Sequence, residues 1–193
     1  PGLIHADILL IGREVPTDYG GRIDLLGIDA DGIIHIIELK RDRTPRDVVA
    51  QTLDYASWVK DLDVERYIGI YRTFKNADLA TAFQERFGSA LPDALDEHRM
   101  TIVASSLDAQ SERIVEYLSE FGLDINAVLF CVFDDGHGKL LSRTWLIDPA
   151  EAEIRTVERT TKRARVWTGF YFVNVGVDKN NPNDRRWEDA EKY

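Results

Sequence analysis

Two apolar, β-rich runs, residues 22–28 and 33–39, are joined by the four residues Asp29-Ala30-Asp31-Gly32. Aspartate and glycine in so short a link are typical of a tight turn, so the two runs are predicted to form a β-hairpin. The second run, IIHIIEL, is apolar on both faces, as in a central strand that is covered on both sides. We therefore expect a fold built around a sheet in which residues 33–39 form a central strand.

Charged residues end this apolar strand. Residues two apart in a strand share a face, so Glu38 and Lys40 are expected to project together. Paired positions in a hairpin add up to a constant, which brings Asp24 to within about one position of Glu38. Two converging carboxylates repel each other unless a divalent cation binds between them, and hard oxygen ligands suit Mg²⁺ or Mn²⁺. Lys40 beside that cation could orient or deprotonate an attacking water.

An ordinary cross-strand salt bridge on a half-exposed face is the alternative interpretation of these three residues. It explains poorly why Glu38 and Lys40 end the most apolar strand of the chain. The catalytic interpretation accounts for that position.

A helix is predicted to follow the strand, from Thr44-Pro45 to about Lys60, with threonine as N-cap and proline in the first turn. Gln51 and Tyr55 are four residues apart, so they share one face of this helix. Because the helix follows directly from the strand, that face is expected to lie over Glu38 and Lys40. The alternative is that Tyr55 belongs to the core and Gln51 is only a helix former.

Taken together, Asp24, Glu38-Leu39-Lys40 and the run from Gln51 to Tyr55 resemble the D…ExK…QxxxY signature of the RecB-like nucleases of the PD-(D/E)XK superfamily. Residues 8–72 are especially similar to the C-terminal nuclease domain of NucS/EndoMS-type endonucleases. The resemblance implies an α/β fold with a restriction-endonuclease-like mixed central sheet flanked by helices. It also implies a Mg²⁺ or Mn²⁺ cofactor and hydrolysis of DNA phosphodiester bonds.

The resemblance further implies a role for each motif residue. Asp24, Glu38 and the main-chain carbonyl of Leu39 would bind the metal, and Lys40 would act as the base or orient the water. Gln51 and Tyr55 would support the active site or the DNA. An upstream acid often completes such sites, and Glu14 is the nearest candidate. The basic N-terminal domain of the NucS type is absent from this sequence, so mismatch specificity is not implied.

The rest of the chain reads as alternating strands and helices, an α/β pattern. The expected elements are strands at 7–13, 65–71 and 99–104, helices at 77–87 and 108–121, and a hairpin of 126–133 with 140–147. Residues 1–150 are expected to form the nuclease domain, and 151–193 a basic helix with a C-terminal extension or linker. Because the chain begins with Pro1 and ends just after a turn-rich segment, a further domain beyond either terminus is expected.

The net charge of −10 argues against a simple basic groove-binder, since nucleic-acid affinity rests largely on Lys and Arg. Two basic clusters can still hold a polyanion. DNA is therefore the expected partner, and the residues expected to contact it are Arg41 and Arg43 beside the site and Arg159, Lys162 and Arg163 near the end of the chain. The basic and aromatic segment 163–175 fits a nucleic-acid surface and a packed strand equally well.

Several features are given ordinary explanations. No run is long and apolar enough for a membrane span, and no signal peptide is visible, so a soluble, cytoplasmic protein is expected. Cys131 lies in an apolar run and is predicted to be a small buried hydrophobe. His35 lies on the opposite strand face from Glu38 and is predicted to be a hydrogen-bonded structural histidine. A homodimer is compatible with the sequence, which does not decide the oligomeric state.

The function expected from the sequence is a metal-dependent endonuclease acting on DNA, in defence, restriction or repair. The alternative is a non-catalytic nucleic-acid-binding module that keeps the nuclease scaffold. An unrelated α/β interaction domain is the third hypothesis.

Overall fold

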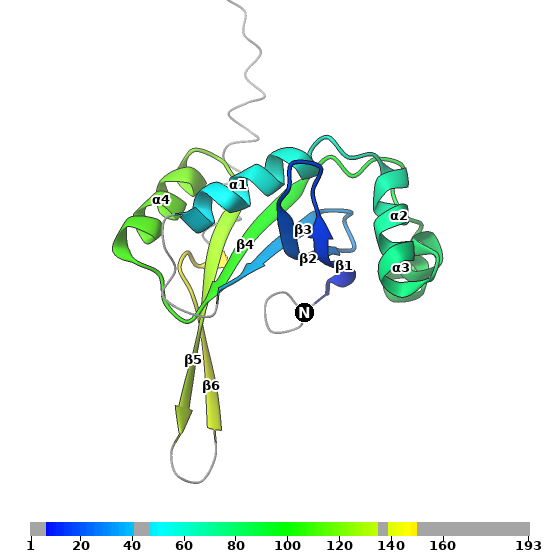
Figure 1. Cartoon of the computed structure of the whole chain (residues 1–193). Helices are drawn as coiled ribbons and strands as arrows, with labels where there is room; N and C mark the ends of the chain where they lie inside the picture. Colours follow the sequence, from blue (N-terminus) through cyan, green and yellow to red (C-terminus); the bar gives the residue numbers. More distant parts are fainter. Residues whose placement is uncertain (1–6, 41–46, 135–138, 150–193) are drawn as a thin grey trace, which may run out of the picture. The chain divides into compact units, whose positions relative to one another are not determined.

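A single six-stranded mixed sheet organises the described part of the chain (Figure 1). The computed structural model describes residues 7–40, 47–134 and 139–149, and for 133–134 and 139–140 the backbone alone. All of these lie in one compact unit, Pro1–Val157. The strands lie in the order of the sequence, and only β3 with β4 and β4 with β5 are parallel. Their bounds are β1 Leu9–Pro16, β2 Arg22–Ile28, β3 Ile34–Leu39, β4 His98–Ala104, β5 Ile125–Asp134 and β6 Lys139–Trp145.

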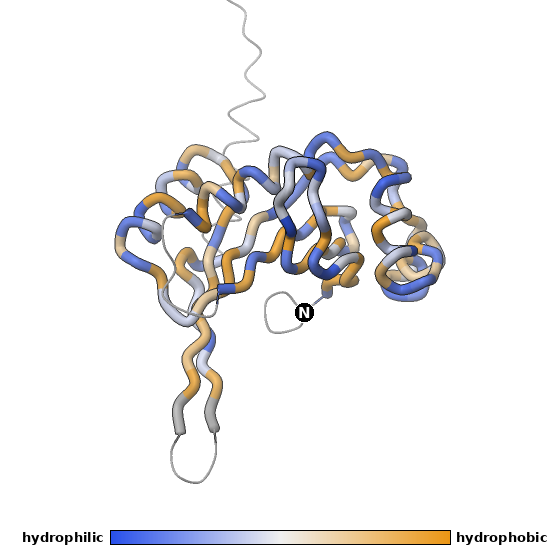
Figure 2. The backbone as a smooth tube through the Cα atoms, in the orientation of Figure 1, coloured by the Kyte–Doolittle hydropathy of each residue, from blue (hydrophilic) through white to orange (hydrophobic). Residues whose placement is uncertain are grey.

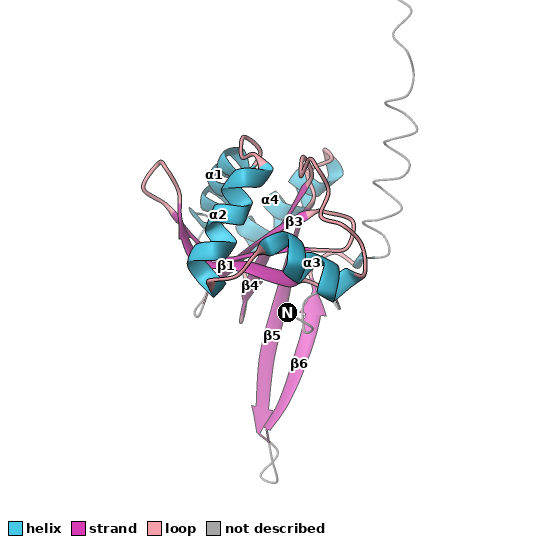
Figure 3. Ribbon diagram, turned by 90° about the vertical axis from the view of Figure 1, so that its right-hand side faces the viewer, coloured by secondary structure: helices cyan, strands magenta, loops and turns pink. Residues whose placement is uncertain are grey.

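Four helices accompany the sheet in the described residues: α1 Asp47–Val59, α2 Val64–Lys75, α3 Leu79–Phe87 and α4 Ala109–Glu120. Figures 1 and 3 show α1 and α4 over one face of the sheet and α2 and α3 beside β1. Buried apolar side chains of that face, such as Leu26, Ile36 and Ile102, form one core cluster with Val48 and Val59 of α1. The mixed sheet flanked by helices confirms the predicted α/β class.

The β2–β3 hairpin forms as predicted, and its register decides where the charged residues lie. Leu25 pairs with Ile37 and Ile28 with Ile34, so paired positions add up to 62, as they do for residues 24 and 38. The turn is held by Asp29, whose Oδ1 accepts hydrogen bonds from the amides of residues 31 and 33. His35 is buried and bonded to Asp29 Oδ2 at 2.9 Å, which confirms its structural role.

Residues 65–71 were predicted as a strand, and this prediction is wrong: they belong to helix α2. Asp63 is its N-cap and accepts a hydrogen bond from the amide of Arg66. Tyrosine and isoleucine favour strands, but the buried pair Tyr67 and Tyr71 repeats at helical spacing and faces the core. Tertiary packing and the cap therefore override strand propensity.

The prediction that Cys131 is buried is also wrong, because Cys131 is exposed. The β4–β5 pairing ends at Ala104–Leu129, whereas the β5–β6 pairing continues to Asp134–Lys139. Beyond Leu129 the two strands form an arm that projects from the sheet (Figures 1 and 3). Figure 2 shows apolar residues continuing along this arm, so apolar sequence here does not mean burial.

The remaining predicted elements agree with the structure to within a few residues. Three predictions fall outside the described residues: the helix start at 44–46, the hairpin tip at 135–138 and the basic helix and extension of 151–193. The division into 1–150 and 151–193 stays a prediction. Within the described ranges, no helix has the length and apolarity needed to cross a membrane.

Candidate active site

Glu38 is a buried carboxylate near the end of β3, with a side chain that is only 2% exposed. Its Oε1 accepts a hydrogen bond from Lys40 Nζ at 2.7 Å. Its Oε2 is buried and, among the described residues, has no hydrogen-bond partner. An unpaired buried carboxylate oxygen is costly, so this atom requires either a proton or a ligand.

Asp24 lies on the neighbouring strand β2, opposite Glu38 by register. The β2–β3 ladder pairs stop at Leu25–Ile37, although both strands continue further. Beyond that point the amide of Leu39 donates to Asp24 Oδ2 at 2.7 Å, instead of to the backbone of β2. Because the N–H and C=O of one strand residue point to the same side, the Leu39 carbonyl is directed towards β2 and Asp24 as well.

A chain of hydrogen bonds joins the strand to α1. Lys40 Nζ donates to Gln51 Oε1 at 3.0 Å, and Gln51 Nε2 donates to the Tyr55 hydroxyl at 2.6 Å. The Tyr55 hydroxyl also accepts the amide of Arg22, at the start of β2, at 3.1 Å. A lysine can only donate, so it fixes the orientation of the Gln51 amide. The side chains of Glu38, Lys40, Gln51 and Tyr55 are thus brought together, as the sequence predicts.

The electrostatics of Glu38 follow from this arrangement. Burial raises the pKa of Glu38 above its ordinary value, and the negative charge of Asp24 raises it further. The hydrogen bond and the positive charge of Lys40 lower the pKa, and so does the nearby backbone amide of Asp24, without cancelling the effect of burial. The site therefore favours an added positive charge beside Glu38.

Hard oxygen donors are the groups available for a cation. Glu38 Oε2, the Asp24 carboxylate and the Leu39 carbonyl are of the kind that Mg²⁺ and Mn²⁺ prefer, and Mg²⁺ commonly keeps several waters beside one or two carboxylates. In the described ranges no group of three or more His, Cys, Asp or Glu side chains could hold a metal. The residues thus fit a cation with two carboxylates and one carbonyl, and not a fully protein-enclosed site.

Glu14 is not gathered into this group. The pairing of β1 with β2 places it opposite Asp24, between the pairs Arg13–Leu25 and Val15–Ile23. However, its backbone is left-handed, with φ 49°, and its carboxylate is 60% exposed and 3.8 Å from the guanidinium of Arg22. The backbone conformation therefore turns Glu14 away from the regular strand direction.

Sequence reasoning missed the contacts that hold the β1–β2 loop on α1. Asp18 accepts a hydrogen bond from Trp58 Nε1 at 2.9 Å and one from Arg66 at 3.0 Å. Trp58 lies one helical turn after Tyr55, so the β1–β2 loop and the candidate site contact the same face of α1. The spacing of Tyr55 and Trp58 is the sequence feature from which this contact could have been predicted. The predicted DNA-binding residues Arg41, Arg43, Arg159, Lys162 and Arg163 lie outside the described residues.

Comparison with known proteins gives two structural neighbours. A repair endonuclease from Pyrococcus abyssi is 25% identical over 65% of this chain and 40% of its own, with a TM-score of 0.36. An EndoMS solved in complex with double-stranded DNA is 25% identical over 66% of this chain and 38% of its own, with a TM-score of 0.39. No protein-family model matches the chain. The matched region therefore spans about two fifths of the length of these two endonucleases.

Proposed function

We propose that this chain is a metal-dependent deoxyribonuclease that hydrolyses phosphodiester bonds with Asp24, Glu38 and Lys40. One observation carries the proposal: the Glu38 carboxylate is buried, bonded to Lys40 through one oxygen and without a partner at the other. A fold that buries a carboxylate in this way incurs a cost that a bound cation removes. The resemblance of the motif residues to the PD-(D/E)XK nucleases supports the same assignment.

Each residue has a role that follows from its contacts. Asp24, Glu38 and the Leu39 carbonyl would hold Mg²⁺ or Mn²⁺, which when bound supplies Lewis acidity towards a phosphate oxygen. Among the described residues Lys40 donates to Glu38 and Gln51, so one of its three donors is available to a water or a phosphate oxygen. Gln51 and Tyr55 keep the lysine in place and act as positioning residues.

The non-catalytic binding module remains the rival function. A scaffold that only binds nucleic acid has no physical need for a buried carboxylate facing a second carboxylate. The enzyme is therefore the function that the geometry supports best.

The test compares wild-type protein with Glu38→Gln on supercoiled, linear and single-stranded DNA, in Mg²⁺, Mn²⁺ or EDTA. We expect metal-dependent cleavage by the wild type and a loss of roughly a thousandfold or more in Glu38→Gln, since a neutral amide cannot replace a charged ligand. Glu116→Gln, an exposed change on α4, is the matched control and should cleave normally. Wild-type protein that binds DNA but cleaves none of the substrates in either metal would favour the binding module.

A further inference from the structure

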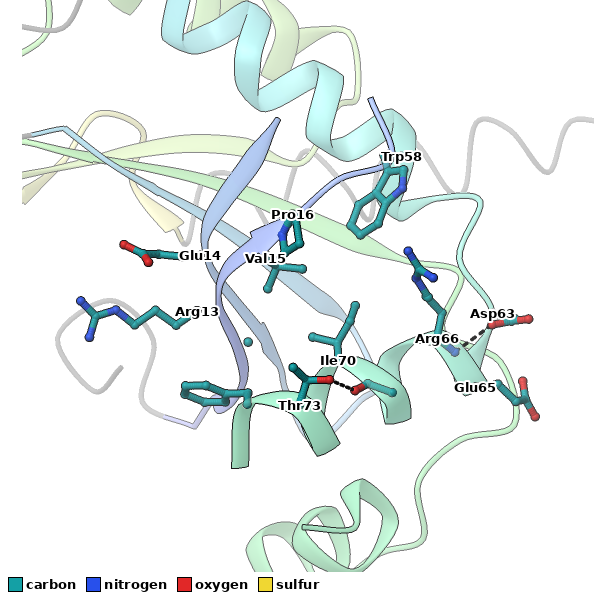
Figure 4. A pocket seen from close by; sticks show the side chains of 13 residues that line it. Arg13, Glu14, Val15, Pro16, Trp58, Asp63, Glu65, Arg66, Ile70 and Thr73 are labelled. Carbon is teal, nitrogen blue, oxygen red and sulfur yellow. Dashed lines mark hydrogen bonds between the residues drawn. The ribbon is translucent and has the colours of Figure 1, made fainter. Parts of the chain in front are cut away.

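A cleft of about 860 Å³ lies between β1 and α2 (Figure 4). Strand residues 12–16 form one wall, one stripe of α2 forms the other, and Trp58 of α1 also lines the cleft. Its volume is within the range of ordinary ligand sites. Glu14 belongs to this lining and is opposite Asp24 in the β1–β2 register, so the strand that lines the cleft is the neighbour of the strand that carries Asp24.

Two residues of the lining depart from local rules. Gly69 lies inside helix α2, where glycine costs about 1 kcal/mol relative to alanine. A Cβ added there would meet nothing within 4 Å, so no packing requires this glycine. Glu14 adopts the left-handed backbone conformation, at a cost of about 1–2 kcal/mol for a residue with a side chain. Such departures are expected where a site needs space or a particular geometry.

The lining combines an apolar floor with a rim of both charges. Val15 and Ile70 lie between the strand and the helix in Figure 4, and Phe74 also belongs to the apolar part of the lining. Among the charged residues of the lining, three carboxylates outnumber two guanidinium groups, which disfavours a phosphate; they belong to Glu14, Asp63, Glu65, Arg13 and Arg66. A flat, neutral heterocycle that both donates and accepts hydrogen bonds matches this surface, and a nucleobase is such a group.

We propose that the β1–α2 cleft binds a nucleobase of the DNA strand that enters the candidate active site, an inference that rests on the proposed function. The absence of a side chain at Gly69 keeps the space open, and the apolar floor stacks against the base. A base inside a duplex is stacked and paired on both sides, so the cleft accepts a base only outside the helix stack.

Gly69→Gln separates this role from a structural one. Glutamine is a better helix former than glycine, so the variant should be at least as thermally stable as the wild type. Its side chain would extend into the cleft. Ala80→Gln is the control, because Ala80 is an exposed helical residue of α3 outside the cleft.

Affinity is measured by fluorescence anisotropy in EDTA, which prevents cleavage, with one labelled oligonucleotide used as a single strand and as a blunt duplex. We expect Gly69→Gln to bind the single strand about tenfold more weakly and the duplex unchanged, while Ala80→Gln resembles the wild type. An unchanged affinity for the single strand, an equal loss for both probes, or no binding of either probe by the wild type would overturn the base site. If the expected pattern appears but no metal supports cleavage, the proposed function fails and the base site stands.

Discussion

The β2–β3 and β5–β6 hairpins are both antiparallel and apolar in sequence, yet they differ in how much of their surface other elements cover. Ile34 and Ile36 of β3 are buried in the core cluster that includes α1, whereas Val132 of the arm is 63% exposed. Apolar sequence therefore predicts strands without saying what covers them. The difference also has an electrostatic consequence: charged groups at the end of the covered hairpin interact in a less polar medium, so removing one has a larger effect.

The largest expected difference between the hairpins concerns apolar contacts. Ile36→Ala, in the covered hairpin, removes a fully buried side chain from the core beneath α1. We expect a loss of about 3 kcal/mol or more in the free energy of unfolding, because a cavity adds to the lost burial. Urea titration measures it. A loss below about 1 kcal/mol would mean that β3 is less covered than the structure indicates.

The second prediction concerns Lys40→Ala, which removes the ammonium group that pairs with the buried Glu38 carboxylate. We expect the free energy of unfolding to fall by about 2–3 kcal/mol at neutral pH. This is at or below the usual loss for a broken buried ion pair, because Lys40 is partly exposed. The pKa of Glu38 is already raised above 4.5 in the folded protein, so stability falls as pH rises from 4.5 through the folded pKa. Without Lys40 the pKa of Glu38 rises further. The loss of stability in Lys40→Ala should therefore be greatest at pH values above this pKa, and it should vanish at low pH, where Glu38 is protonated.

Thermal melting of the metal-free protein between pH 4 and 8 tests this pH dependence. The double variant Glu38→Gln, Lys40→Ala is the control, since it has no charge at position 38. It should recover much of the lost stability at neutral pH. A loss in Lys40→Ala that is the same at every pH would show that the lysine contributes packing alone.

The third prediction concerns the network above the covered hairpin. Gln51→Ala removes the acceptor of Lys40 and should slow cleavage by about ten- to a hundredfold, about 1.4–2.7 kcal/mol of barrier, while metal binding is retained. Tyr55→Phe removes the oxygen that accepts from Gln51 and Arg22, and should slow cleavage to a similar extent. Single-turnover rates at saturating metal measure both. A fully active Tyr55→Phe together with an unfolded Tyr55→Ala would make Tyr55 a core residue only.

The smallest effect is expected on the projecting arm. Val132→Thr keeps a β-branched side chain at an exposed position, so the free energy of unfolding should change by no more than about 0.5 kcal/mol. Urea titration of Val132→Thr and Ile36→Ala under the same conditions compares their free energies of unfolding directly. A loss above about 1.5 kcal/mol would mean that the arm is covered in solution.

Much of the candidate site follows from sequence because its positions are linked by short-range geometry. The hairpin register puts residue 24 opposite residue 38, and helical spacing puts Gln51 and Tyr55 on one face. Contacts made by backbone groups carry no such signal. The amides of Leu39 and Arg22 could belong to any residue type, so their bonds to Asp24 and Tyr55 were not predictable.

The two wrong predictions have different physical causes. For residues 65–71, the strand preference of isoleucine and tyrosine was given more weight than two local helix signals, the Asp63 cap and the helical spacing of the two buried tyrosines. For Cys131, an apolar run suggested a covered strand, but the pairing with β4 ends before that residue is reached. Only in this second case does the outcome depend on neighbours distant in the sequence, which a local pattern does not contain.

The hydrogen-bond chain above β3 has a direction. The Tyr55 hydroxyl oxygen accepts from Gln51 and from the Arg22 amide, and among the described residues no acceptor takes its own proton. Lys40 likewise retains one N–H beyond those given to Glu38 and Gln51. The lysine and the tyrosine hydroxyl therefore each hold a donor on the α1 side, whereas the unpartnered acceptor of the network, Glu38 Oε2, lies at its other end. A phosphodiester, whose non-bridging oxygens carry no hydrogen at neutral pH, matches the donor of Lys40, and a cation matches Glu38.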